Sequence, residues 1–217
     1  MTRLPPSASI AHKGDGPKLC APSAIRNTPA IVACLDSVAP QSGRALEIAS
    51  GTGQHITALA AAIPGLHWHP SEIAQDRIDS INAYAQDASL DNLHPARLLD
   101  ATTPDWAATH TPYDLIYLGN LLHLITDEAA SAVLIETAKA ITPAGVFVIY
   151  GPFRRAGQLI SDADAVFDSE LRAADPDIGY KDDGWVIQML TQAGLGDTVT
   201  SDMPANNLAF IARPEIS

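Results

Sequence analysis

Leu46-Glu-Ile-Ala-Ser-Gly-Thr-Gly-Gln-His55 is the stretch that decides the fold. The apolar run over residues 45–49 predicts a strand, and it enters a glycine turn that opens a helix with apolar residues on one face. Gly51 and Gly53 allow the backbone to approach a ligand closely, and the start of the helix offers unpaired N–H groups. The stretch therefore predicts a strand–turn–helix unit that binds a ligand at its turn.

Two features separate this turn from the dinucleotide-binding pattern G-x-G-x-x-G. The third glycine position is Ile56, and Glu47 lies in the strand, four residues before Gly51. The pyrophosphate of a dinucleotide lies on the N–H groups of such a turn, and a neighbouring carboxylate would repel it. A ligand that carries an ammonium and a sulfonium group is attracted instead, and S-adenosylmethionine is such a ligand.

Strands and helices alternate outward from the turn, which is typical of a parallel sheet with helices on both faces. Further strands are predicted at 66–69, 97–99, 113–118 and 146–150, and two more around 197–201 and 208–212. A first helix is predicted from Thr28, with Pro29 in its first turn. Two later helices are predicted to begin near Thr126 and at Ser161, and a last helix to end at Gly194. The pattern predicts one α/β domain.

Polar residues follow the next three strands, where open α/β sheets bind their ligands. Glu72 is expected to hold both ribose hydroxyls, and Asp100 to accept from the adenine amino group, with Ala101 supplying a backbone N–H. Asn120 is expected to face the amino-acid end of the ligand. Each acid alone also suits a helix cap or a solvated position, but the ordered set favours the cofactor.

Composition excludes several classes of partner. The 217 residues include 13 Lys and Arg against 25 Asp and Glu, a formal net charge of -12, which disfavours nucleic acid and anionic membranes. Two cysteines cannot form a disulfide framework, and no stretch has the length of a membrane span, so a cytoplasmic location is expected. His67 and His69 alternate on one strand without a third ligand, so no metal site is predicted.

Motifs shared with one protein family occur along most of the chain. They lie at 21–27, 46–55, 68–72, 120–123, 150–153, 167–172 and 203–208. On these motifs the chain, from about Leu19 onward, resembles methyltransferase-like proteins of uncertain substrate, related to methyltransferase-like protein 26. The resemblance implies a Rossmann-like sheet of seven strands, mostly parallel with an antiparallel C-terminal strand, and S-adenosylmethionine as cofactor.

The resemblance also predicts the domain boundaries, and one loop of the chain differs from the family's usual sequence. Residues 1–18 are expected to form a flexible leader and 19–217 a single methyltransferase domain, with 19–42 as an N-terminal lid helix. Glu72 stands where the family usually has Asp, which keeps the carboxylate. The loop from Asp175 to Asp182 lacks the family's usual tryptophan and Gly-Ile-Arg, so no substrate contact is inferred there.

Few side chains suit the chemistry of methyl transfer, in which the protein positions a nucleophile and sometimes accepts a proton. His123 is a candidate base, and Tyr150 a candidate to orient a substrate oxygen; the structural alternatives are a wall residue and a core residue. Arg26, with Asn27, is a candidate for the cofactor's carboxylate, with a surface salt bridge as the equal alternative.

The sequence therefore predicts an S-adenosylmethionine-dependent methyltransferase for a small-molecule acceptor, with oxygen as one candidate for the attacked atom. A nicotinamide-dependent oxidoreductase and a non-catalytic cofactor-binding protein are the alternatives, and a homodimer is allowed. The expected substrate contacts are Phe153, Asn206 and Asn207, although Asn pairs also serve turns. The expected cofactor contacts are Arg26, Asn27, Glu47, Ala49, Ser50, Gly51, Gly53, Glu72, Asp100, Ala101 and Asn120.

Overall fold

The computed structural model describes residues 4–110 and 112–215. Its strands are β1 (His12–Lys13), β2 (Leu19–Cys20), β3 (Gly43–Ile48), β4 (Leu66–Glu72), β5 (Arg97–Leu98), β6 (Tyr113–Gly119), β7 (Ile141–Pro152), β8 (Asp197–Asp202) and β9 (Asn207–Arg213). Its helices are α1 (Pro22–Asp36), α2 (Gln54–Ala62), α3 (Gln75–Ala88), α4 (Asp127–Ala140), α5 (Asp162–Ala174) and α6 (Asp183–Gln192). Two short 3-10 helices are η1 (Trp106–Thr109) and η2 (Leu122–Leu124).

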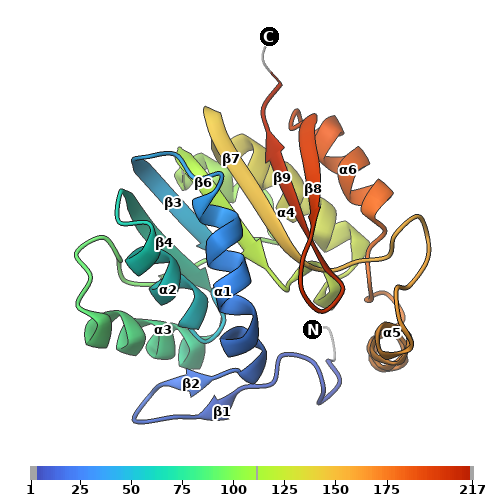
Figure 1. The fold of residues 1–217 in the computed structure, drawn as a ribbon, viewed down its shortest axis with the longest axis horizontal. Helices are drawn as coiled ribbons and strands as arrows, with labels where there is room; N and C mark the ends of the chain where they lie inside the picture. The colour runs from blue at the N-terminus through green and yellow to red at the C-terminus, as the bar shows by residue number, and fades with distance from the viewer. Residues whose placement is uncertain (1–3, 111, 216–217) are drawn as a thin grey trace.

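Seven strands form one twisted sheet in the order β5-β4-β3-β6-β7-β9-β8 (Figure 1). The five strands β5, β4, β3, β6 and β7 run parallel to one another. Strand β9 lies between β7 and β8 and is antiparallel to both. This confirms the predicted α/β fold class, a mostly parallel Rossmann-like sheet of seven strands with an antiparallel C-terminal strand. The short pair β1–β2 lies apart from this sheet.

Helices cover both faces of the sheet, which explains the apolar character of its central strands. Alternate residues of β6 divide between the two faces: Leu115 and Tyr117 pack with α1, α2 and α3, and Ile116 and Leu118 pack with α4 and α6. All four side chains are fully buried. Helix α5 lies beyond the end of the sheet that carries the glycine turn (Figure 1).

Helix α1 begins earlier than predicted. It starts at Pro22, not after Thr28, and Pro29 lies inside it. The Thr28 hydroxyl donates to the Ala24 carbonyl one turn back, so it does not cap a helix start. Proline lacks the N–H of one helical hydrogen bond, and packing of Ile31 and Leu35 against the sheet offsets that loss.

Two of the other predicted helix starts are confirmed. Thr126 and Ser161 each accept a backbone N–H from the residue three positions on, as N-caps of α4 and α5. Helix α6 ends at Gln192, just before Gly194, whose φ of 88° breaks the helix. Among the residues described, no helix has the length and apolar character that a membrane crossing requires.

Residues 4–20, here called the N-terminal segment, run along one end of the molecule from α5 to α3 (Figure 1). The Ser7 hydroxyl donates to Glu170 of α5 at 2.5 Å. Arg77 of α3 donates to the Ser9 hydroxyl at 2.7 Å, and the Leu19 N–H donates to the α3 side chain of Ser80. The expected flexibility of this leader stays a prediction, and so does the lid role of 19–42, but the described part has partners on two helices.

Gly53 sets the distance between the glycine turn and α3. Its φ is 93°, and a Cβ there would lie 2.8 Å from the Ile81 Cα, whereas the nearest atom to a Cβ on Gly51 is 3.4 Å away. We expect Gly53→Ala to lower the free energy of unfolding by roughly 2–4 kcal/mol, from left-handed strain plus overpacking. Gly51→Ala should cost only about 1 kcal/mol, from strain alone. Urea unfolding compares them, and equal losses would contradict this assignment.

Candidate functional site

A cleft of about 1010 Å³ lies at the carboxyl ends of β3, β4 and β6, between α5 and the N-terminal segment. Most of the predicted site residues line it, although they come from distant parts of the chain. These are Arg26, Ala49, Ser50, Gly51, Glu72, Asp100, Asn120, His123 and Asn207. The structure therefore brings the expected cofactor residues of four successive strand ends to one cleft.

The glycine turn is held to the neighbouring strand β4 by hydrogen bonds. The Ser50 N–H donates to the Ser71 carbonyl at 2.8 Å, and the Ser71 hydroxyl donates to the Glu47 carbonyl at 2.8 Å. The Gly51 N–H donates to Oε2 of Glu72 at 3.0 Å. The turn is thus a rigid wall of the cleft, cross-linked to the strand that carries the second acid.

Glu72 is the last residue of β4, not a residue just past it, and its side chain is buried at the cleft wall. Its Oε1 accepts the Ile73 N–H at 2.8 Å, so both oxygens are oriented by backbone amides. Of the cations in the part of the chain described, none lies within ion-pair distance of this carboxylate. Each oxygen retains a lone pair for a hydroxyl donor from a ligand.

The third strand end behaves differently from the prediction. Oδ1 of Asp100 accepts the Thr102 N–H at 3.0 Å and the Thr102 hydroxyl at 2.6 Å, so this acid orders its own turn while it lines the cleft. Ala101 is buried and its carbonyl accepts from Trp106 Nε1 at 3.1 Å. Asp100 stays a candidate contact, whereas Ala101 packs behind the cleft wall.

Glu47 lies beneath the glycine turn and does not line the cleft. Its Oε2 has no hydrogen-bond partner among the residues described. Burial raises the pKa of this carboxyl to about 8, with a hydrogen bond from Ser50 opposing the shift and the charge of Glu72 adding to it. Glu47 is therefore a buried acid beneath the glycine turn, and it is not positioned for the direct ligand contact that the sequence predicted.

Asn120 connects the ends of β6 and β7. Its φ is 56°, its N–H donates to the Tyr150 carbonyl at 2.8 Å, and its side chain reaches the cleft. The preceding Gly119 leaves room for the Tyr117 hydroxyl, which would be 2.3 Å from a Cβ there. The left-handed backbone, which Asn tolerates, turns the chain sharply at this point.

His123 lies in η2 at the cleft wall and is buried. Burial, together with the charge of Lys181, lowers its pKa from 6.5 to about 3. The ring is neutral at physiological pH and is a weak base. It packs edge-on against Phe167 and Tyr180, with ring centroids 5.9 and 6.0 Å away. A hydrogen-bonding role suits this imidazole better than proton abstraction.

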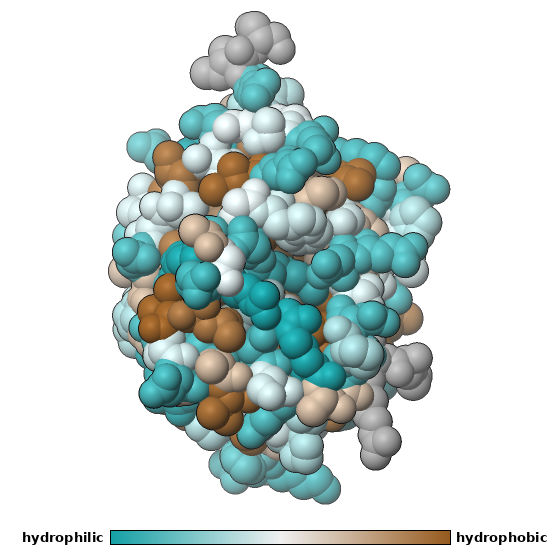
Figure 2. Space-filling model, turned by 90° about the vertical axis from the view of Figure 1, so that its right-hand side faces the viewer, coloured by the Kyte–Doolittle hydropathy of each residue, from teal (hydrophilic) through white to brown (hydrophobic). Residues whose placement is uncertain are grey.

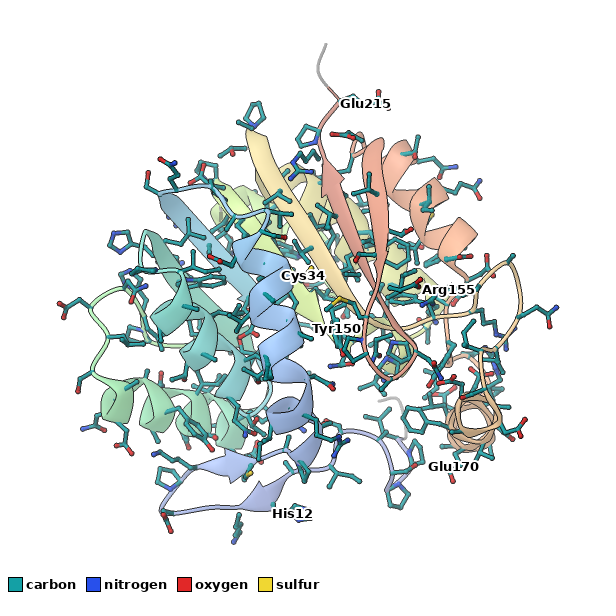
Figure 3. All side chains as sticks on the ribbon, viewed as in Figure 1. His12, Cys34, Tyr150, Arg155, Glu170 and Glu215 are labelled. Atoms are coloured by element: carbon teal, nitrogen blue, oxygen red, sulfur yellow. The ribbon has the colours of Figure 1, made fainter. Side chains whose placement is uncertain are left out.

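Other predicted residues lie outside the cleft lining. Tyr150 is buried beside α1, and burial raises its pKa to about 12 (Figure 3). Phe153 packs edge-on against Phe210 in the core, with centroids 4.8 Å apart. Asn206, at the β8–β9 turn, donates to the side chain of Asp164 on α5 at 3.1 Å. Asn27 of α1 and the buried Gly53 are likewise absent from the lining.

Among the described residues, Arg26 and Arg77 are the arginines that line the cleft, and only Arg26 was predicted. Arg26 is exposed, and no acid of the described residues is within ion-pair distance of it, so the surface salt bridge is not found. Arg77 of α3 was missed because its partner, Ser9, lies 68 residues away. The prediction also missed three other cleft residues, Asp164, Phe167 and Tyr180. Phe167 lies in the shared motif at 167–172, and Tyr180 lies in the loop from Asp175 to Asp182. No local pattern marks them as cleft residues.

A family model described as "Protein of unknown function (DUF938)" matches residues 18–213. The chain belongs to this family. The fold of this DUF938 protein is similar to that of an O-methyltransferase family protein from Burkholderia thailandensis, with a TM-score of 0.72, 14% identity, and 87% of this chain and 56% of that chain covered.

Two further solved structures are similar to the DUF938 chain. One is the SAH-bound form of a methyltransferase in calicheamicin biosynthesis, with a TM-score of 0.72, 14% identity, and 89% of this chain and 54% of that chain covered. The other is human N-acetylserotonin methyltransferase in complex with SAM, with a TM-score of 0.69, 14% identity, and coverages of 87% and 52%. The chain spans about half the length of these structures, and at such identities the similarity establishes the fold.

Proposed function

We propose that this DUF938 protein is an S-adenosylmethionine-dependent methyltransferase for a small-molecule acceptor, with oxygen the leading candidate for the attacked atom. The observation that carries the proposal is the pairing of Glu72 with Gly51: a buried carboxylate without a cation, held by backbone amides at the edge of a glycine turn. Similar folds in structures described as methyltransferases, two of them with SAH or SAM, support it.

The cleft residues fit such a cofactor. Glu72 has two oriented oxygens that suit the two hydroxyls of a ribose, and Asp100 lies at the next strand end, toward an adenine. Arg26 has no ion-pair partner among the described residues and suits a carboxylate, and Asn120 lines the same cleft. When bound, the cofactor would supply an electrophilic methyl group on a sulfonium.

The protein's own groups would position the acceptor and exclude water. His123 is neutral and presents an imidazole at the cleft wall, where it can hold an acceptor hydroxyl by a hydrogen bond. Asn207 is buried and lines the same wall, while its amide donates to the Pro204 carbonyl. Asn206, which was predicted together with Asn207, lies outside the cleft lining and donates to Asp164 of α5.

We also propose a relation to methyltransferase-like protein 26, a cytoplasmic location, a homodimer, and no nucleic-acid or membrane partner. Nothing in the site favours the nicotinamide-dependent oxidoreductase. The Gly51 N–H, which would hold a pyrophosphate, already donates to Glu72, and Glu47 lies below. A non-catalytic cofactor-binding protein differs from the proposed enzyme only in turnover.

Calorimetric titration with S-adenosylhomocysteine tests cofactor binding, and we expect saturable binding to one site per chain. Incubation with S-adenosylmethionine and a small-metabolite extract tests turnover by the accumulation of S-adenosylhomocysteine. An Asn120→Ala variant, which changes a cleft side chain at the end of β6, should reduce that accumulation at least tenfold, on the scale of about 1.4 kcal/mol. Binding without turnover would favour the non-catalytic alternative, and no binding at millimolar concentrations would end the proposal.

A further inference from the structure

One wall of the cleft carries a single charged side chain. This wall, here called the acceptor wall, is the part of the cleft lining that comes from β6 and the chain that follows it. Among its described residues, Asp164 is the only acid, and there is no lysine or arginine. The wall comprises Gly119, Asn120, Leu121, His123, Leu124, Ile125, Thr126, Ala129, Pro152, Asp164, Phe167, Tyr180, Ala205 and Asn207.

Neutral donors fix the Asp164 carboxylate in place. Its Oδ1 accepts the Tyr180 hydroxyl at 3.2 Å, and its Oδ2 accepts the Ser161 hydroxyl at 2.7 Å and the Asn206 amide at 3.1 Å. These bonds join α5, the loop before α6 and the β8–β9 turn. Such a network orients the carboxylate but leaves its charge uncompensated.

The cations near this end of the protein are paired with other acids. Arg154 and Arg172 both contact Asp168 at 2.9 Å, and Lys181 contacts Asp127 at 2.7 Å. No cation of the described residues is within ion-pair distance of Asp164 itself. Asp164 therefore gives the acceptor wall a net negative charge.

Two aromatic rings belong to the same wall as Asp164. Phe167 and Tyr180 lie edge to face, with centroids 6.1 Å apart, and both contact the His123 ring. Phe167 is one helical turn from Asp164 on the same side of α5, because both line the cleft. An anionic carboxylate beside aromatic rings in a partly apolar cavity is the combination that binds an organic ammonium group.

We propose that the acceptor wall binds a cationic nitrogen of the methyl acceptor, so that the substrate is a small molecule with an ammonium group. This rests on the proposed function. The ammonium serves for recognition and is not the nucleophile, because a protonated amine has no lone pair to attack a methyl group. Asp164 also offsets the repulsion between this ammonium and the positive sulfonium in the same cleft.

Benzylamine and benzyl alcohol test the site, because they share a ring and differ in the charged group. Their affinities are measured by calorimetry with and without bound S-adenosylhomocysteine. We expect the wild-type protein to bind benzylamine at least tenfold more tightly than benzyl alcohol. Asp164→Asn should reduce this ratio to below about twofold. Asp162→Asn, an equal change of charge at an exposed position of the same helix turn outside the cleft, should preserve it.

A second variant keeps the inference testable if Asp164→Asn fails to fold. Phe167→Leu removes a half-buried ring and keeps apolar bulk, and it should lower the benzylamine preference about threefold. Equal binding of the two probes by the wild-type protein, or a preference that Asp164→Asn leaves intact, overturns the inference. Failure of S-adenosylhomocysteine to bind is read separately: it overturns the proposed function, while the preference in the free protein still reports on the wall.

Discussion

Glu47→Gln is expected to raise the free energy of unfolding by roughly 3–5 kcal/mol at pH 8 and to leave it close to wild type at pH 5. Burial raises the pKa of Glu47 from 4.5 to about 8. The folded wild-type protein therefore binds one proton more than the unfolded chain between these values. Its stability falls as the pH rises from about 4.5 through 8, whereas glutamine has no proton to lose.

The surroundings of Glu47 explain why ionisation costs so much there. Its Oε2 and the hydroxyls of Tyr117 and Tyr150 are buried without hydrogen-bond partners among the described residues. Glu72 is a further negative charge nearby, and Ser50 alone offers a hydrogen bond to the carboxylate. Among the described residues no cation forms an ion pair with Glu47, so the neutral acid is preferred.

Urea unfolding at several pH values between 5 and 8 measures this difference. Glu128→Gln, at an exposed position in the first turn of α4, removes the same charge without burial. That control should change stability by about 1 kcal/mol or less, from the helix dipole, with little dependence on pH. Parallel pH profiles for the wild type and Glu47→Gln would show that this carboxyl titrates normally.

Glu72→Ala is expected to weaken S-adenosylhomocysteine binding about 30- to 300-fold. The loss corresponds to roughly 2–3.5 kcal/mol, the scale of two charge-assisted hydrogen bonds from the hydroxyls of a ribose. The variant also removes the acceptor of the Gly51 N–H, so the edge of the glycine turn loses its connection to β4. Both effects act on the same half of the cleft.

The matched control for this experiment is Asp79→Asn in α3. Asp79 is an exposed acid outside the cleft that accepts from Gln75 at 2.8 Å, a bond that asparagine can keep. It should leave the affinity within about twofold of wild type, as a surface charge distant from the ligand would. Comparable affinities for Glu72→Ala and the wild type would place the ribose elsewhere in the cleft.

Local sequence signals predicted the elements of the fold well. The buried strands at the centre of the sheet appear as apolar runs, and the caps Thr126 and Ser161 act within one helical turn. The start of α1 was missed because Thr28 and Pro29 carry the local pattern of a helix start, and only packing against the sheet explains why the helix begins at Pro22 and continues through Pro29.

The site was predictable where the topology of the sheet fixes it. Parallel strands bring their carboxyl ends to one edge, so Gly51, Glu72 and Asn120 meet in the cleft. Depth was not predictable: Glu47 and His123 are near the right place but buried, because the packing of distant elements decides how far a side chain is from solvent. The same holds for Asp164, which reaches the cleft only through the position of α5.

The N-terminal segment spans the cleft between Glu170 on one helix and Arg77 on another, at the end of the molecule marked by His12 and Glu170 (Figure 3). The face that carries β8 and α6 is mostly hydrophilic, with apolar side chains scattered over it (Figure 2). A nucleoside-sized molecule that leaves past this segment has to break its contacts with both helices. Release of the spent cofactor by this route would then require the segment to move, in addition to the loss of the cofactor's own contacts.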